Sequence, residues 1–76
     1  MKPRAMKPAE LDRALRRYAR DRGLDYWSKS NTGGGSHRVV SVGARKAVLP
    51  WHAGRDLKTG TLRGILRTLG IDPADL

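Results

Sequence analysis

Apolar residues with helical spacing occur near both ends of this 76-residue chain, and each set needs a second layer of structure to bury it. The first set predicts an amphipathic helix that begins at Pro8 and stops at Gly23, with a stripe formed by Leu11, Ala14, Leu15, Tyr18 and Ala19. The second predicts a helix with Thr59 or Thr61 as its N-cap and Gly70 as its stop, with a stripe formed by Leu62, Ile65, Leu66 and Leu69. Both helices must therefore bury their stripes against another part of the chain, and the segment between them can form that layer.

Three short stretches with strand character lie in that segment. They are expected at residues 24–29, 36–42 and 46–49, with a loop of small and polar residues at 30–35 and a tight turn at 43–45. Pro50 is expected to end the third strand, because proline has no N–H for the ladder. Consecutive strands with short connections favour an antiparallel meander. We therefore predict an α+β fold, an α-β-β-β-α two-layer sandwich in which both helices cover one face of a three-stranded antiparallel sheet.

The charge of the chain indicates the class of its partner. Sixteen Lys and Arg oppose seven Asp and Glu, which gives a formal net charge of +9 at pH 7. This excess favours nucleic acid, although an acidic protein or an anionic membrane surface would be attracted by the same field. Cysteine is absent, which excludes disulfides, thiolate zinc sites and thiol nucleophiles. Two histidines without a patterned set of carboxylates give no reason to expect a metal.

The chain shows no sign of export or membrane insertion. Residues 1–15 lack the apolar run of a signal peptide, and no later segment is long enough to span a bilayer. We expect a cytoplasmic protein in which residues 1–5 are a disordered N-terminal extension and residues 6–76 form a single domain.

One turn carries the residues best suited to chemistry. Gly33, Gly34 and Gly35 lead into Ser36 and His37, at the start of the second expected strand. Glycine lets the backbone approach a ligand closely, and imidazole exchanges protons near neutral pH. The same residues also fit an ordinary loop followed by a surface histidine. Because valines fall on both sides of the alternation in this strand, the sequence does not decide which face His37 occupies, although its terminal position favours exposure.

Three motifs occur in order along the chain: Gly34-Gly35-Ser36-His37 in the turn, Pro50-Trp51-His52 after the third strand, and Lys58-Thr59-Gly60-Thr61-Leu62-Arg63-Gly64-Ile65-Leu66 with a closing Gly70. In this order and spacing, residues 6–71 resemble the HicA family of small toxins from toxin–antitoxin modules. One departure is the loop from Ser30 to Gly35, which is longer and richer in glycine than the family's usual turn.

This resemblance implies a double-stranded-RNA-binding-domain-like fold and a type II toxin without a cofactor. The toxin would be a metal-independent endoribonuclease that cleaves messenger RNA, with the family's catalytic histidine at His37. A HicB-like antitoxin is the implied partner. We expect it to be acidic, to occlude His37 and to contact Gly34, Gly35 and Ser36. Its carboxylates are expected to pair with Arg38, Lys46 or Lys58 at the rim.

The chemistry of RNA cleavage can be matched to individual residues. RNA supplies its own nucleophile, the 2′-hydroxyl, so cleavage without a metal needs a proton acceptor, a proton donor and positive charge on the phosphate. His37 can act as acceptor or donor. The groups expected to bind phosphate are the side chains of Lys29, Arg38, Arg45, Lys46 and Lys58 and the backbone N–H groups of Gly34 and Gly35. The hydroxyl of Ser36 either orients the phosphate or only stabilises the turn.

Two interpretations stay open for several residues and for the whole chain. His52 is either a second acid or base, or a structural residue that holds the connector in place. Trp27 and Trp51 either stack on bases or pack in the core. The arginines of the first helix either contact phosphate or form a solvated face. For the whole chain, an RNA-cleaving enzyme and a non-catalytic RNA- or DNA-binding module of the same fold are both possible.

Overall fold

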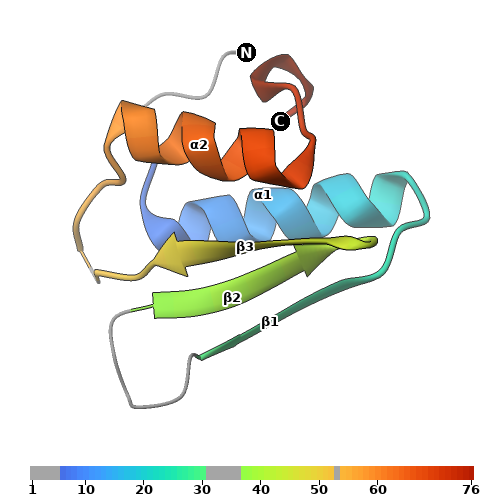
Figure 1. The fold of residues 1–76 in the computed structure, drawn as a ribbon, viewed down its shortest axis with the longest axis horizontal. Coiled ribbons are helices and arrows are strands. Elements are labelled where there is room, and N and C mark those ends of the chain that lie inside the picture. The colour runs from blue at the N-terminus through green and yellow to red at the C-terminus, as the bar shows by residue number, and fades with distance from the viewer. Residues whose placement is uncertain (1–5, 31–36, 53) are drawn as a thin grey trace.

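A computed structural model of the chain describes residues 6–30, 37–52 and 54–76, so the extension expected at residues 1–5 lies outside it. Its elements follow the predicted order, with one short 3₁₀ helix, η1, added after the second α-helix (Figure 1). Their bounds are α1 (Pro8–Asp21), β1 (Tyr26–Ser30), β2 (His37–Val42), β3 (Arg45–Pro50), α2 (Thr59–Leu69) and η1 (Pro73–Asp75). The α-β-β-β-α order is confirmed.

The three strands form one antiparallel sheet in the order β1-β2-β3. Helix α1 packs on β1 and β2, while α2 packs on β3. Both helices lie on the same side of the sheet, which is its upper side in Figure 1. The predicted two-layer sandwich with both helices on one face is therefore confirmed.

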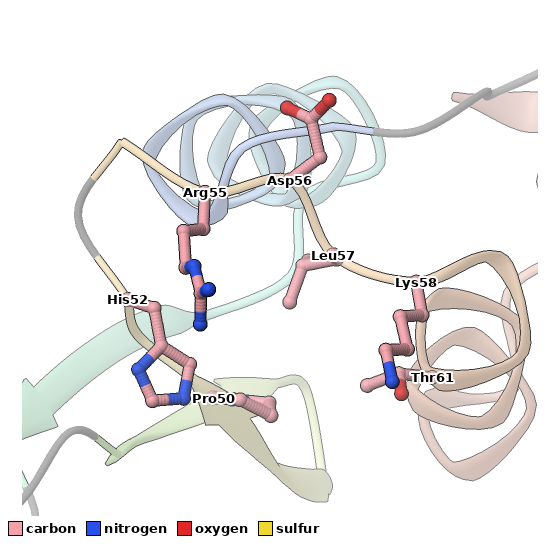
Figure 2. A pocket seen from close by; sticks show the side chains of 7 residues that line it. All are labelled: Pro50, His52, Arg55, Asp56, Leu57, Lys58 and Thr61. Atoms are coloured by element: carbon pink, nitrogen blue, oxygen red, sulfur yellow. The ribbon is translucent and has the colours of Figure 1, made fainter.

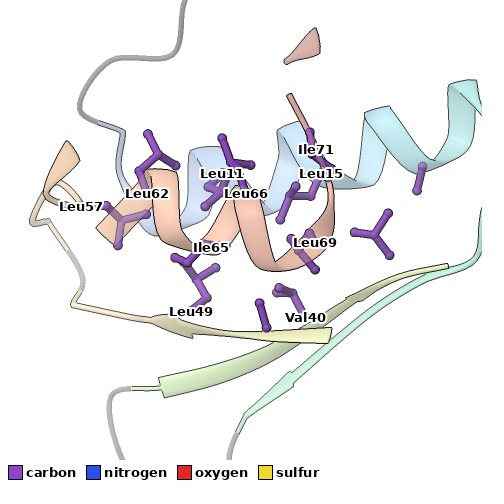
Figure 3. Close-up of a cluster of buried hydrophobic side chains, with 13 residues drawn as sticks. Leu11, Leu15, Val40, Leu49, Leu57, Leu62, Ile65, Leu66, Leu69 and Ile71 are labelled. Carbon is purple, nitrogen blue, oxygen red and sulfur yellow. The ribbon is translucent and has the colours of Figure 1, made fainter. Parts of the chain in front are cut away.

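The hydrophobic core fills the space between the helices and this covered face of the sheet (Figure 3). The predicted apolar stripes supply most of it, because Leu11 and Leu15 of α1 and Leu62 and Leu66 of α2 are all at most 1% exposed. The remaining buried apolar residues are Ala19, Val40, Val42, Ala47, Leu49, Leu57, Ile65, Leu69 and Ile71. The described helices and strands therefore share one contiguous core.

The ends of the helices follow the prediction in part. Pro8 lies in the first turn of α1, as expected, and the backbone N–H of Lys7 donates to the Glu10 carboxylate at 2.9 Å. Gly70 closes α2 with a φ of 71°, in the left-handed region that glycine adopts without strain. The predicted N-cap of α2 is wrong, because Lys58 holds that position and its side chain has no oxygen to accept from the first-turn amides.

The ends of the third strand also differ from the prediction. The turn before it contains only Gly43 and Ala44, since Val42 pairs directly with Arg45. Gly43 has a φ of 60°, at the first turn position where two-residue hairpins of type II′ place glycine. Pro50 is the last residue of β3 and pairs with His37. The third strand, expected at residues 46–49, therefore extends one residue further at each end. Pro50 is tolerated as its last residue because β3 is an edge strand, where that residue can lack a donor.

A polar cluster on the covered side fixes β1 against α1. The Tyr26 hydroxyl donates to the Asp12 carboxylate, and Arg16 lies 3.8 Å from that carboxylate and 5.3 Å from the centre of the Tyr26 ring. Burial, together with the Asp12 carboxylate, raises the pKa of Tyr26. The phenol is thus held neutral and hydrogen-bonded, and it anchors the strand that carries Trp27.

Candidate nucleic-acid interface

The register of the sheet decides which side chains share the face that no helix covers. Residues paired directly across neighbouring strands point to the same side, and residues alternate along each strand. Since Val40 and Leu49 are buried under the helices, their strand neighbours point away from them. We call this second side the open face. Its residues are Trp27, Lys29, His37, Val39, Ser41, Lys46, Val48 and Pro50. Within the described parts of the chain, no helix or strand packs over it.

His37 lies at one end of the open face, as the first residue of β2, and its side chain is exposed. It pairs with Pro50, the last residue of β3. The register thereby settles the question that the alternating valines left open, because Val40 and Val42 are core residues and Val39 lies on the side of His37. An imidazole in this position is accessible to a ligand that docks on the sheet.

Trp27 lies farther along the open face, on the edge strand β1, and two lysines approach its ring. The Lys29 Nζ is 5.0 Å from the centre of the Trp27 ring system, and the Lys46 Nζ is 5.5 Å from it. Both distances fall within the range of a cation–π interaction. Ser41 pairs with both Trp27 and Lys46 and is only 2% exposed, which indicates that these larger side chains cover it. The result is an aromatic ring flanked by two positive charges on a solvent-facing sheet.

The two arginines predicted beside His37 belong to the other side of the sheet. Arg38 donates from Nε to the Ser28 hydroxyl at 3.1 Å, and its guanidinium lies 4.8 Å from the centre of the Trp51 ring. Arg45 pairs with Val42 at the far end of β2, and its side chain lies against Gly70. Of the five cations expected to bind phosphate, the structure therefore brings only Lys29 and Lys46 onto the open face.

His52 and Lys58 line a separate cavity of about 660 Å³ between the end of β3 and the start of α2 (Figure 2). The backbone N–H of Arg55 donates to the His52 carbonyl at 3.0 Å, which closes the connector into a turn. The cavity is lined by Pro50, His52, Arg55, Asp56, Leu57, Lys58 and Thr61. Since Pro50 also pairs with His37, the cavity adjoins the histidine end of the open face.

The backbone groups of the predicted site are not described. Gly34, Gly35 and Ser36 lie outside the described residues, and their expected contacts with phosphate stay predictions.

A second basic surface lies on α1, in the other layer of the molecule. The exposed side chains of Arg13, Arg16, Arg17 and Arg20 surround a shallow depression of about 200 Å³ on the outer side of this helix. Arg16 also pairs with Asp12. The positive charge of the protein is therefore distributed over both layers, and the open face differs from α1 in combining charge with an exposed aromatic ring and a histidine.

The described residues place no group of three or more His, Asp or Glu side chains where they could hold a metal ion. None of the helices in this part of the chain is long and apolar enough to cross a membrane. Comparison of the chain with models of protein families, with curated proteins and with solved structures found no match. The functional assignment consequently depends on the residues of the site.

Proposed function

We propose that this protein is an endoribonuclease that cleaves messenger RNA without a metal ion, and that His37 is an acid or base of the reaction. The observation that carries the proposal is the position of an exposed imidazole on the same open face as Trp27, Lys29 and Lys46. A net charge of +9 attracts a polyanion to the protein, and Lys29 and Lys46 supply part of that charge on this face. The motifs that resemble the HicA family support the same activity.

The reaction requires no group that the chain lacks. The 2′-oxygen attacks the adjacent phosphorus and loses its proton, while the bond from phosphorus to the 5′-oxygen breaks and that oxygen gains a proton. His37 can remove the first proton in its neutral form or deliver the second in its protonated form, and His52 or water makes the other transfer. Lys29 pairs with Val39, two residues from His37 along β2, and supplies positive charge on the same face. The products are a 2′,3′-cyclic phosphate and a 5′-hydroxyl.

We further propose that the protein is the toxin of a toxin–antitoxin pair whose inhibitor is an acidic, HicB-like protein. An inhibitor that covers the histidine end of the open face would stop proton transfer and block RNA at once. The positive charge of this face would speed its association. Coexpression with such an inhibitor is expected to restore the growth of cells that produce the protein.

A non-catalytic RNA- or DNA-binding module is the second candidate. The specific observation that favours it is the cluster of Trp27 with Lys29 and Lys46, which can bind a nucleic acid without any proton transfer.

The deciding experiment separates cleavage from binding. Wild-type protein and the His37→Ala and His52→Ala variants are incubated in EDTA with a labelled single-stranded RNA, and binding is measured with the same RNA carrying 2′-O-methyl groups. We expect His37→Ala to lose about 10²- to 10⁴-fold in cleavage rate, the usual contribution of a general acid or base, while it keeps its affinity. Cleavage that proceeds at the wild-type rate in His37→Ala would refute the role of His37. Binding of the RNA without cleavage by the wild type would refute the enzyme and leave the binding module.

The two histidine variants also test the role of His52. The chain has two histidines, so His52→Ala removes the only imidazole besides that of His37. Loss of cleavage in both variants would indicate that the two histidines share the proton transfers. Loss in His37→Ala alone would assign His52 to the structure of the connector.

A further inference from the structure

We propose that Trp27 is a stacking platform for one unpaired base of single-stranded RNA, and that Lys29 and Lys46 bind the phosphates on either side of that base. This inference builds on the proposed function, from which it takes RNA as the ligand. It adds a subsite away from the reacting phosphate and a preference for unpaired RNA.

The exposure of Trp27 is the first argument. Its side chain is 37% exposed, whereas Trp51 is half-buried, packs against the core and lies under the Arg38 guanidinium. Trp27 and Val48, which is 51% exposed, are two of the three exposed large hydrophobic residues in the described chain, and both lie on the open face. The third, Leu24, lies against Gly43 at the turn. The open face thus offers apolar surface that the core does not use.

The placement of the two lysines is the second argument. Lys29 follows Trp27 by two residues on β1, about 7 Å along the strand, whereas Lys46 reaches the ring from β3, about 10 Å across the sheet. The two positive charges therefore approach the ring from different directions. In single-stranded RNA, each base lies between two phosphates, so an aromatic ring with a cation on each of two sides matches this alternation.

The third argument is the chemistry of the ligand. A flat aromatic side chain binds a base by its face, and in a duplex those faces are already stacked on neighbouring base pairs. A duplex would offer the open face its phosphates alone and would leave Trp27 and Val48 without a partner. Single-stranded RNA is therefore the form of nucleic acid that this surface fits best.

The position of Trp27 relative to His37 defines the subsite further. Trp27 pairs with Ser41, which is four residues from His37 along β2, about 13 Å. The base on Trp27 consequently does not belong to the nucleotide whose phosphate is cut. Trp27 would position the strand, while His37 would carry out the proton transfers.

Fluorescence of Trp27 tests the platform directly. The chain has two tryptophans, so a Trp51→Phe background leaves Trp27 as the sole tryptophan. A short single-stranded RNA with 2′-O-methyl riboses, which cannot be cleaved, should quench its emission in a saturable manner. The corresponding duplex should quench it much less. Unchanged emission at RNA concentrations that saturate binding would overturn the inference.

Affinity measurements with the same 2′-O-methyl RNA provide the second test. Trp27→Ala should weaken binding about 5- to 150-fold, as found for other stacked bases, and Trp27→Phe should keep most of the affinity. Trp51→Phe is the matched control and should bind as the wild type does. Far-UV circular dichroism shows whether Trp27→Ala folds. If Trp27→Ala does not fold, the RNA affinities of Trp27→Phe, Lys29→Gln and Lys46→Gln are measured instead. Unchanged affinity in all three variants would overturn the inference.

Other outcomes separate this inference from the proposed function. If Trp27→Ala binds RNA normally while His37→Ala abolishes cleavage, the platform is wrong and the enzyme stands. If RNA binding depends on Trp27 but no variant or wild type cleaves RNA, the platform stands and the enzyme is wrong. Analytical ultracentrifugation tests whether a second copy of the chain, instead of RNA, covers the open face. If Trp27→Ala turns an oligomer into a monomer and leaves RNA affinity unchanged, the open face is an interface between copies of the chain, and the platform is wrong.

Discussion

The two faces of the sheet are built from the same three strands, yet they differ in almost every property. On the covered face, Val40 and Leu49 are completely buried, and their neighbours Val39 and Val48 lie on the other side, where Val48 is 51% exposed. The covered face contributes the buried apolar side chains on which the helices pack. The open face carries Lys29, Lys46 and Trp27 as well as His37. Adjacent residues of one strand therefore have different roles. One packs in the core and stabilises the fold, and the next is exposed and accessible to a ligand.

The largest effect we expect comes from truncating neighbouring residues of β3. Leu49→Ala should lower the free energy of unfolding by about 2–5 kcal/mol, because it leaves a cavity under the helices. Val48→Ala, the matched change on the open face, should stay within about 0.5 kcal/mol of the wild type. Urea denaturation followed by circular dichroism measures both. Equal losses would mean that the open face is as tightly packed as the covered one, contrary to the comparison.

A smaller effect is expected when positive charge is removed from each layer. A double variant, Lys29→Gln with Lys46→Gln, should weaken the binding of single-stranded RNA and lower the slope of log affinity against log salt by about 1.4, at about 0.7 for each phosphate contact. The matched double variant Arg13→Gln with Arg17→Gln removes the same charge from α1 and should retain most of the slope. Salt titrations of both variants by fluorescence anisotropy provide the measurement. The reverse pattern would place the RNA on the helices.

The smallest effect we expect is the pH dependence of the stability that Tyr26 contributes on the covered side of the sheet. Burial and the Asp12 carboxylate raise the pKa of Tyr26 above its ordinary value of 10.0, so folding favours the neutral phenol. This contribution to stability is complete below about pH 10 and is lost as the pH rises through the pKa of the folded state. Tyr26→Phe should therefore be less stable than wild type at neutral pH, and the difference should narrow only as the pH rises above about 10. Denaturant midpoints across this range test it, with Asp12→Asn as the companion variant. A constant difference would contradict the assignment.

The order of the helices and strands and their two-layer arrangement could be predicted from the sequence, because local patterns of apolar residues and glycines mark each element. The stripes of both helices and the glycines at 43 and 70 mark elements by their own spacing and backbone needs, and they lie where they were expected. The N-cap of α2 was missed, because a threonine near a helix start is a statistical preference and Lys58 took the position instead. The extent of β3 was missed because edge strands tolerate a final proline.

The composition of the candidate site depended on contacts that sequence spacing does not reveal. The four cations near His37 in sequence separate onto two faces once the register is known, and only Lys29 and Lys46 share its side. The bond between Tyr26 and Asp12 joins two elements and left no local signal. Trp27 and Trp51 were equivalent in the sequence, whereas the structure exposes the first and packs the second.

Nuclear magnetic resonance titration of the ¹⁵N-labelled protein with the 2′-O-methyl single-stranded RNA tests most directly whether the open face is the RNA-binding surface. Our account predicts that the largest shifts occur at the Trp27 indole N–H and at the backbone amides of Lys29, His37, Lys46 and Val48. The amides of Arg13, Arg17 and Arg20 on α1 should shift little. Shifts concentrated on α1, with the Trp27 indole unchanged, would contradict the account.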